Sequence, residues 1–379
     1  IFGAINLYIS DHIYFYMVKN YAVLLVIIFS GLLQFSCSSE ETYVPIQQSA
    51  ATSPVIFNPE ATPFNTLSEY HFFEGNLKDL SPVLGVLPYQ PINSLFTDYA
   101  HKKRFIWMPE NQKATYVNDY SILNFPDGTV FIKNFYYQNT LPNNLPRIIE
   151  TRLVYKSNEG WKFANYIWND NQTEAYFDLS GSYTDVTFIE NGVTRNTTYR
   201  IPSAAECFTC HKSEINSIPI GPKPQNLNKD LAYADGVKNQ LQKWIEIGYL
   251  EDNLPNTINT VSNWQDPTSA RNDRIRGYLD INCAHCHSQD RHCDYRPVRF
   301  AFGDYQGEVS LGVCVDPDTP IAPYSKIVEP NNIARSLIHF RLNNTQEEYR
   351  MPLLGRTLIH QEGVILLEQW ITSLTQNCE

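Results

Sequence analysis

Two motifs of the form C-x-x-C-H constrain this chain more than any other feature. They are Cys207-Phe208-Thr209-Cys210-His211 and Cys283-Ala284-His285-Cys286-His287. This spacing is typical of covalent haem attachment, in which two thiols form thioethers with the porphyrin vinyl groups and the adjacent histidine ligates the iron. Paired C-x-x-C elements also hold structural zinc, and one such element serves thioredoxin-type redox chemistry, but neither explains a histidine after both pairs.

The motifs therefore predict two covalently bound haem c groups. His285, inside the second motif, is expected to lie on the surface without a ligand role. No residue is assigned a catalytic role. Haem attachment is assigned to Cys207, Cys210, Cys283 and Cys286, and iron ligation to His211 and His287.

Met351 is the expected sixth ligand of the second haem. It is followed by Pro352 and stands just before a C-terminal amphipathic segment. Thioether ligation raises the reduction potential relative to two histidines. The competing interpretation of Met351 is a core methionine. For the first haem the sixth ligand stays open among Met108, His71, His101, His339 and His360.

The N-terminal region predicts export. Lys19 precedes an apolar run from Tyr21 to Leu33, which is short for a bilayer span, and Ser36-Cys37 follows. We interpret residues 17–36 as a lipoprotein signal peptide, Cys37 as the lipidation residue and residues 1–16 as translated upstream sequence. An uncleaved membrane anchor is the alternative. Residues 37–66, rich in Ser, Thr, Pro, Gln and Ala, predict a flexible tether.

Residues 67–200 show the alternation of an antiparallel β region. Turn signals separate the runs at Pro126-Asp127-Gly128, at 157–160 and at Asn191-Gly192, and several short strands with such turns suggest a sandwich. The expected fold class is α+β, an N-terminal antiparallel β-sandwich followed by mostly α-helical c-type haem domains. These comprise a first haem segment over 201–265 and a cytochrome c domain over 266–379.

Three helices are expected after residue 200. The first carries Val237, Leu241, Trp244 and Ile245 on one face and stops at Gly248. The second starts near Asp266-Pro267 and ends at Asn282, and the third runs from about Gln361 to Leu374.

Charge and cysteine usage narrow the partners. Forty acidic against twenty-nine basic side chains give a formal charge of -11, which argues against nucleic acid and favours a basic redox partner. Of the eight cysteines, Cys293, Cys314 and Cys378 have no assigned role. In an oxidising compartment a disulfide between Cys293 and Cys314 is expected, with Cys378 free.

With these residues in view, the chain resembles a family of exported di-haem c-type cytochromes of undefined physiological role. The resembling segments cover most of the mature chain and include 95–100, 125–130, 150–153, 199–202, 219–223 and 278–287. The C-terminal residues 334–337, 351–352 and 362–364 resemble exported cytochrome c domains. The resemblance implies a possible partner, a parallel β-helix protein encoded nearby.

Electron transfer at the cell envelope is the expected function, with lipid anchoring in the periplasm or on the outer-membrane surface and redox proteins as partners. A haem enzyme of the peroxidase or small-molecule reductase type is an alternative, because the first haem has no obvious sixth ligand. A third possibility is a glycan- or partner-binding β module whose haems relay electrons. Its candidate surface is Trp161, Tyr166 and Trp168, which are otherwise core aromatics.

Overall fold

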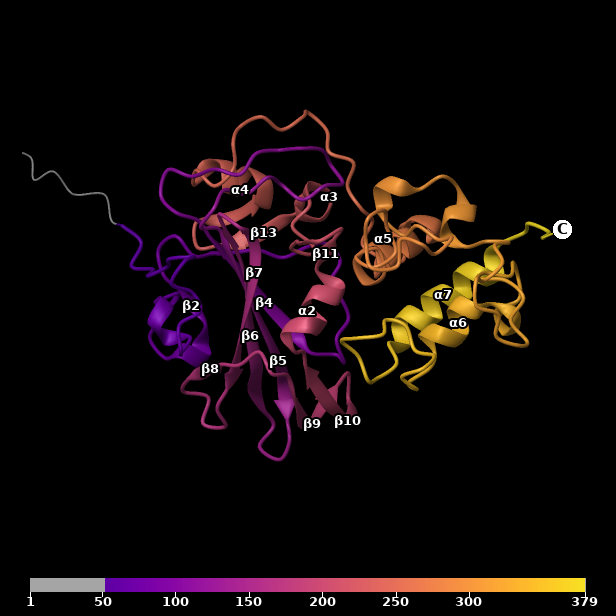
Figure 1. Cartoon of the computed structure of the whole chain (residues 1–379), viewed down its shortest axis with the longest axis horizontal. Coiled ribbons are helices and arrows are strands. Elements are labelled where there is room, and N and C mark those ends of the chain that lie inside the picture. Colours follow the sequence, from indigo (N-terminus) through magenta and orange to yellow (C-terminus); the bar gives the residue numbers. More distant parts are fainter. Residues whose placement is uncertain (1–51, 379) are drawn as a thin grey trace, which may run out of the picture. The chain divides into compact units, whose positions relative to one another are not determined.

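An eight-stranded antiparallel sheet organises the computed structural model, which describes residues 52–378. The strand order is β10-β9-β5-β6-β7-β8, and β4 pairs with both β3 and β5. The expected signal peptide, Cys37 and the first part of the tether lie outside the described residues. The strands are β3 (Leu87–Pro88), β4 (His101–Trp107), β5 (Val130–Thr140), β6 (Leu145–Ser157), β7 (Gly160–Trp168), β8 (Ala175–Phe177), β9 (Ser182–Glu190) and β10 (Val193–Ile201) (Figure 1).

Two of the expected turns are confirmed. Ser157 pairs with Gly160 at the end of the β6–β7 hairpin. Asn191 and Gly192 join β9 to β10 with φ values of 52° and 77°, the double positive φ that a two-residue hairpin of this type requires. The long paired strands follow from their alternating and β-branched residues, which fill a pleated surface.

The two faces of the sheet are both buried, but by different material. One face packs Phe105, Ile132 and Leu153 against the segment before β4, including Phe57 and Phe64. The predicted tether over 37–66 therefore extends too far along the chain, because residues within 52–66 already contribute to this core. On the other face, Ile106 and Phe131 pack against residues that follow the sheet in sequence, including Leu241 and Trp244.

Short helices and hairpins follow the sheet. The α-helices are α2 (Ala204–Cys210), α3 (Pro224–Leu227), α4 (Gln240–Glu246), α5 (Arg271–Asn282), α6 (Leu337–Leu342) and α7 (Gln361–Ser373). The two-stranded hairpins are β1 (Phe73–Glu74) with β2 (Ser81–Pro82), β11 (Lys212–Ser213) with β12 (Asn216–Ser217), and β13 (Asp230–Tyr233) with β14 (Gly236–Asn239). Single 3-10 turns are η1 (Ser68–Tyr70), η2 (Leu77–Asp79), η3 (Phe302–Asp304), η4 (Glu308–Leu311) and η5 (Ile333–Arg335).

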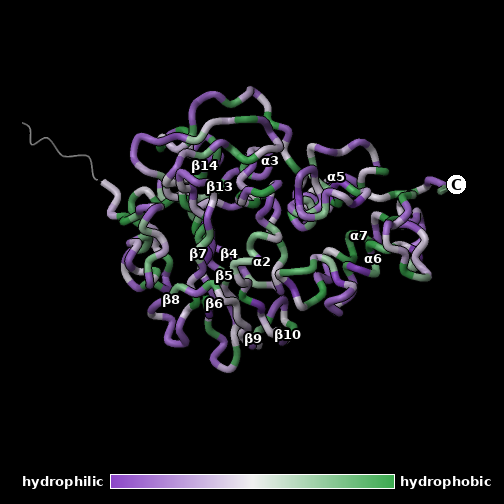
Figure 2. The backbone as a smooth tube through the Cα atoms, viewed as in Figure 1, coloured by the Kyte–Doolittle hydropathy of each residue, from purple (hydrophilic) through white to green (hydrophobic). Residues whose placement is uncertain are grey.

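The helix predictions are confirmed only in part. The terminal helix α7 begins at Gln361 as expected, and hydrophobic residues recur along it (Figure 2). It packs on α5 through a shared core that includes Leu279 and Leu367. The helix expected from Asp266 begins only at Arg271. The first expected helix begins at Gln240, because Val237 belongs to β14 and is 69% exposed.

The expected fold class is wrong on two counts. Helices account for 20% and strands for 28% of the structure, so the region after residue 200 is not mostly helical. Its core includes Val298, Val313 and Val328, which stand outside helices. The β region is one sheet rather than a sandwich, because loops and short helices cover the face where a second sheet was expected. Trp161 lies on one face and Tyr166 and Trp168 on the other, within separate cores, so these aromatics form no common binding surface.

Residues of the expected first haem segment share a core with the sheet, and the chain from Thr52 onward forms one unit. Two buried carboxylates bind distant segments together. Asp98 accepts hydrogen bonds from the backbone N–H groups of Thr357 and Leu358, both at 2.7 Å. Asp280 accepts from Gln225 Nε2 at 3.1 Å and from the N–H of Phe302 at 2.9 Å. Across residues 52–378, none of the helices has the length and apolar character that a membrane span requires.

Candidate functional site

The first C-x-x-C-H motif occupies α2 and the residue after it. Ser203 and Glu206 form a capping box at the start of this helix, which satisfies backbone N–H groups that would otherwise lack partners. Cys207 and Cys210 are three residues apart and therefore share one helix face. His211 follows at the helix end and donates its backbone N–H to the carbonyl of Cys207 at 2.9 Å. The capped helix thus fixes both thiols and the histidine relative to the sheet.

The His211 ring is oriented for ligation through one nitrogen. Its Nδ1 lies 2.8 Å from the carbonyl oxygen of Ile218, and because a carbonyl only accepts, Nδ1 carries the proton. The lone pair is then on Nε2, the arrangement found in metal-ligating histidines whose other nitrogen donates to a carbonyl. The ring also lies edge-on to Phe163, with 5.0 Å between centroids. Burial lowers the pKa of His211 to about 4, so the ring stays neutral at physiological pH.

The second motif lies in the turn that follows α5. The backbone N–H groups of Cys286 and His287 both donate to the carbonyl of Cys283, at 3.0 and 2.9 Å, which brings the three side chains together. His287 Nδ1 is buried and has no hydrogen-bond partner among the described residues. Burial lowers the pKa of His287 to about 4. A buried neutral imidazole with unused capacity suits a metal ligand.

A cavity with a volume of about 290 Å³ opens at the second motif. Cys283, Cys286 and His287 line it together with Met351, so the expected sixth ligand faces the same space as the expected proximal ligand. Much of the remaining wall is apolar. Ligand pockets typically measure about 300–1,000 Å³, so this cavity is close to the lower end of that range.

Hydrogen bonds with Arg341 and Arg356 hold the Met351 loop in place. The Met351 N–H donates to the carbonyl of Arg341 at 2.9 Å, and the Met351 carbonyl accepts from Arg356 Nε at 3.0 Å and Nη2 at 2.7 Å. Arg356 is 2% exposed, and burial lowers the pKa of its guanidinium to about 10. The next residues, Thr357 and Leu358, are the ones held by Asp98, so the loop is anchored to the sheet region.

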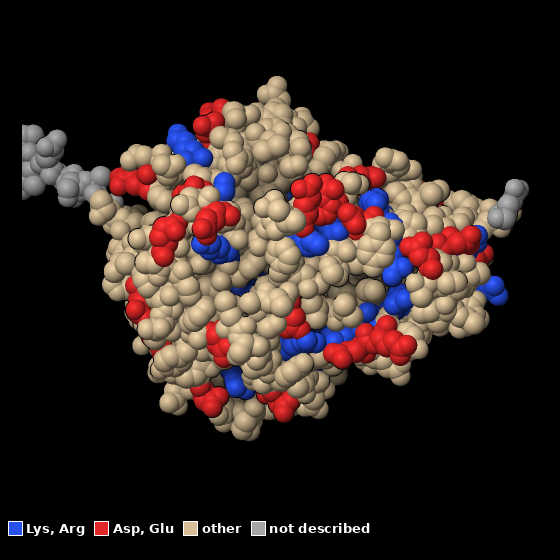
Figure 3. Space-filling model, viewed as in Figure 1, with Lys and Arg blue, Asp and Glu red and all other residues tan. Residues whose placement is uncertain are grey.

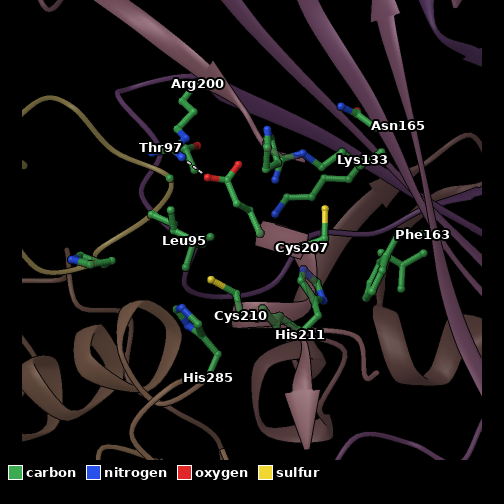
Figure 4. A pocket seen from close by; sticks show the side chains of 18 of the residues that line it. Leu95, Thr97, Lys133, Phe163, Asn165, Arg200, Cys207, Cys210, His211 and His285 are labelled. Carbon is green, nitrogen blue, oxygen red and sulfur yellow. Dashed lines mark hydrogen bonds and ion pairs between the residues drawn. The ribbon is translucent and has the colours of Figure 1, made fainter. Parts of the chain in front are cut away.

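A second cavity, with a volume of about 90 Å³, lies between α2 and the sheet. Figure 4 shows Cys207, Cys210 and His211 on one side, with Lys133 and Asn165 reaching in from the strands. Within the described chain, the lining includes no methionine and no histidine other than His211 and His285.

None of the five expected sixth ligands of the first haem reaches this cavity. Met108 is 2% exposed in the core beside Trp244. His71 caps η1, and His101 lies 3.3 Å from Glu190. His339 lies 2.8 Å from Glu368, and His360 stacks on Phe96 at 4.1 Å.

The two motifs meet through Cys210, His285 and Cys286. One ligand atom from each of these side chains lies within 4.8 Å of the others. Cys210 and His285 also line both cavities, as do Pro352 and Leu354, so the cavities share a wall. His285, expected on the surface, is half-buried: its Nδ1 is buried, and its ring faces Cys210 and Cys286. Its place inside the motif gave no sequence signal, because the contact depends on how the two motifs pack.

The expected disulfide between Cys293 and Cys314 is wrong. Cys314 pairs with Cys378, with a Cα–Cα distance of 5.1 Å, and Cys293 is free. Cys378 follows α7, whose packing on the C-terminal core brings the chain end to Cys314. Cys293 instead lines the cavity of the second motif, where its N–H donates to the carbonyl of Cys286 at 3.0 Å.

Comparison with protein-family models, with curated proteins and with solved structures gave no match for this chain. The function is therefore argued from the site alone. Each motif presents two thiols and a neutral imidazole to its own cavity, and that donor set fits a c-type haem in both places.

Proposed function

We propose that this protein carries two covalently attached haem c groups and transfers electrons through them. The observation that carries the proposal is that each C-x-x-C-H motif lines its own cavity and that the two cavities adjoin at Cys210 and His285. When bound, each haem would supply a reversible one-electron couple. Attachment at Cys210 and Cys286, whose sulfur atoms lie within 4.8 Å, would anchor the two groups at neighbouring points.

The residues have separate roles in this proposal. Cys207, Cys210, Cys283 and Cys286 attach the groups, while His211 and His287 ligate the irons. Met351 provides the sixth ligand at the second site, and Arg356 positions its loop. The low pKa values of His211 and His287 keep both imidazoles available for ligation without competition from protons above about pH 5.

Export and anchoring belong to the same proposal. Covalent haem attachment and the Cys314–Cys378 disulfide both suit a compartment outside the cytoplasm. We infer a lipid anchor at Cys37, a place in the cell envelope and redox proteins as partners, in keeping with the resemblance to exported di-haem cytochromes. A parallel β-helix protein encoded nearby is one such partner to test.

Haem stoichiometry tests the proposal. The chain from Cys37 onward, expressed with an exported haem-attachment system, should carry two haems by mass and by absorbance. Cys207→Ser and Cys283→Ser should each disturb one attachment, whereas Cys293→Ser should leave both intact. Cys293 is a matched control because it lines the second cavity but lies outside the motif. A wild-type chain without covalent haem would reject the proposal.

A haem enzyme is the second candidate function, and the first cavity favours it. Apart from the motif residues, this cavity offers no methionine and only His285 as a histidine among the described residues. A sixth position left open there could bind a small molecule. Carbon monoxide binding by the reduced protein decides between them: two haems indifferent to carbon monoxide support an electron carrier, and one haem that binds it readily supports the enzyme.

Cys210, His285 and Cys286 also form a set that could hold a metal ion, which favours a zinc-type site as the rival cofactor. The two possibilities differ in the residues they need. Cys207→Ser would leave this three-residue set intact but would disturb haem attachment. Bound zinc that survives Cys207→Ser in a haem-free protein would establish the metal site.

A further inference from the structure

Three basic residues stand side by side on adjacent strands of the sheet. Arg104 on β4 pairs with Lys133 on β5, and Lys133 pairs with Arg152 on β6. Residues directly opposite each other in an antiparallel sheet point to the same face, so these side chains form one row. Asn165 on β7, the partner of Arg152, continues it. We call these four residues the cationic row.

The row interrupts an otherwise apolar face. Ile106 and Phe131 lie on one side of it in the core shared with α4, and Phe135 lies on the other side in a second core with Tyr199. Lys102, two residues before Arg104, points to the same face. Like charges placed directly opposite each other destabilise a sheet, so this arrangement needs compensation.

Only part of the charge is compensated within the described residues. Arg152 pairs with the fully buried carboxylate of Glu150, which also accepts from Tyr199 Oη at 2.6 Å. Arg104 donates to Ser94 Oγ at 2.9 Å rather than to a carboxylate. No described carboxylate lies within ion-pair distance of Lys102, Lys133 or Arg104. Burial, followed by the neighbouring arginines, holds the pKa of Lys133 well below its usual range.

Unpartnered polar atoms accompany the row. Asn165 is 2% exposed, and both its Oδ1 and its Nδ2 lack a hydrogen-bond partner among the described residues. Thr97 Oγ1, across the cavity, is also buried without a partner. Lys133, Arg152, Asn165 and Thr97 all line the first cavity. Buried polar groups are normally satisfied, so their convergence here points to a polar ligand-binding site.

We propose that three residues of the cationic row, Lys133, Arg152 and Asn165, bind an anionic oxygen group, a carboxylate or small oxyanion, inside the first cavity. Lys133 supplies an amino group that has no carboxylate within ion-pair distance among the described residues, Arg152 a planar donor group and Asn165 an amide N–H. The same chemistry has two sources, the carboxylates of a haem attached at Cys207 and Cys210 or a free oxyanion that enters the cavity. Figure 3 shows Lys and Arg side chains interspersed with Asp and Glu on the visible surface of the molecule, in a chain that is acidic as a whole.

The site does not depend on haem attachment, because the row belongs to the sheet. The experiment uses the full chain from Cys37 onward, with haem content measured first. Thermal unfolding is followed against propanoate and against sulfate, at constant ionic strength. Resonance Raman spectra of any bound haem report the environment of its carboxylates.

Lys133→Gln is the test variant. Lys103→Gln is its matched control, since Lys103 is exposed and points to the opposite face of the sheet, next to the Arg104–Lys133 pair. Lys133→Gln should raise the unfolding midpoint in anion-free buffer and remove any anion-dependent rise. Lys103→Gln should change neither. Asn165→Asp should place a carboxylate in the row, raise the midpoint and abolish anion binding, so a fold defect cannot imitate the expected result.

The outcomes of these measurements distinguish the two sources of the anionic group. A Lys133-dependent shift of the haem carboxylate modes identifies the cofactor as the source, and tenfold weaker binding of propanoate or sulfate in Lys133→Gln identifies a free oxyanion. Absence of covalent haem from the purified chain would reject the proposed function. Anion binding to that haem-free chain would still support the proposed anion site in the first cavity. If neither readout responds to Lys133→Gln and Asn165→Asp is not stabilised, the row binds no anion.

Discussion

The sulfur atoms of Cys210 and Cys286 lie within 4.8 Å of each other, although the two residues belong to different C-x-x-C-H motifs. Hydrogen bonds between residues next to the two motifs also hold the motifs together. Glu214 donates its N–H to the carbonyl of Asp290 at 2.7 Å, and Arg291 Nη1 donates to the carbonyl of Lys212 at 2.9 Å. The geometry therefore holds the two motifs side by side, with their cavities adjoining.

The thioether of Met351 is expected to set the potential of the second haem. Met351→Leu should leave the haem attached but lower its reduction potential by on the order of 0.1 V, within the range of about 0.8 V over which axial ligands act. Met108→Leu is the matched control, because Met108 is buried away from both cavities. A spectroelectrochemical titration measures both. An unchanged potential in Met351→Leu would remove the ligand assignment.

Arg356 should matter to the second site without touching the cofactor. Arg356→Gln removes the hydrogen bonds from the guanidinium to the carbonyls of Met351, Arg341 and Leu358 and should lower the free energy of unfolding by about 3 kcal/mol or more, since each bond from a charged donor contributes about 1.5–3 kcal/mol. It should also reduce the fraction of haem with thioether ligation, seen by absorption of the oxidised protein. Equal loss of stability with full thioether ligation would mean that Arg356 is only structural.

His360 should make the protein sensitive to acid. Burial lowers its pKa from 6.5 to about 3 in the folded state, and it lies against Tyr278 Oη at 3.1 Å. The unfolded chain takes up a proton below pH 6.5 that the folded chain refuses, so stability is full above pH 6.5 and falls as the pH drops toward 3. Between pH 7 and pH 4.5 this contributes about 2–3 kcal/mol.

Denaturant unfolding of wild type and His360→Asn at several pH values measures this contribution. The variant should lose less stability than wild type over the same interval, because the other buried histidines are common to both proteins. Parallel curves would show that His360 is not the group responsible.

Loss of the disulfide should be costly. Cys314 and Cys378 are 64 residues apart, and closing a loop of that length stabilises a fold by about 4 kcal/mol in the chain-entropy account. Cys378→Ser should therefore lower the unfolding midpoint, and a reductant should destabilise wild type but not the variant. Cys293→Ser should resemble wild type, since Cys293 is free. Insensitivity of wild type to reductant would contradict the pairing.

Local signals were sufficient where the structure is local. Asn191-Gly192 predicted its hairpin and the apolar stripe after Gln361 predicted α7, because turn chemistry and helical period act within a few residues. The pairing of Cys314 with Cys378 and the position of His285 could not be predicted, since both depend on packing between distant segments. The C-x-x-C-H motifs can be recognised from the spacing of their residues, but the cavities that they line cannot be predicted from the sequence.

The cationic row shows the same limit. Lys133 and Arg152 are charges inside apolar strand segments, which is visible in the sequence. Whether the two side chains lie opposite each other depends on the register between β5 and β6. That register shifts between Phe135 and Tyr136. The single sheet was likewise mistaken for a sandwich, because alternation shows that a strand is buried and not what covers it.

The Cys314–Cys378 bond encloses Met351, α6 and α7 in one covalent ring. A protease that cut once within this ring would nick the chain without releasing a fragment, so the wall of the second cavity would remain tethered to the rest of the protein. The ring would therefore let a nicked molecule keep its Met351 loop close to the second cavity.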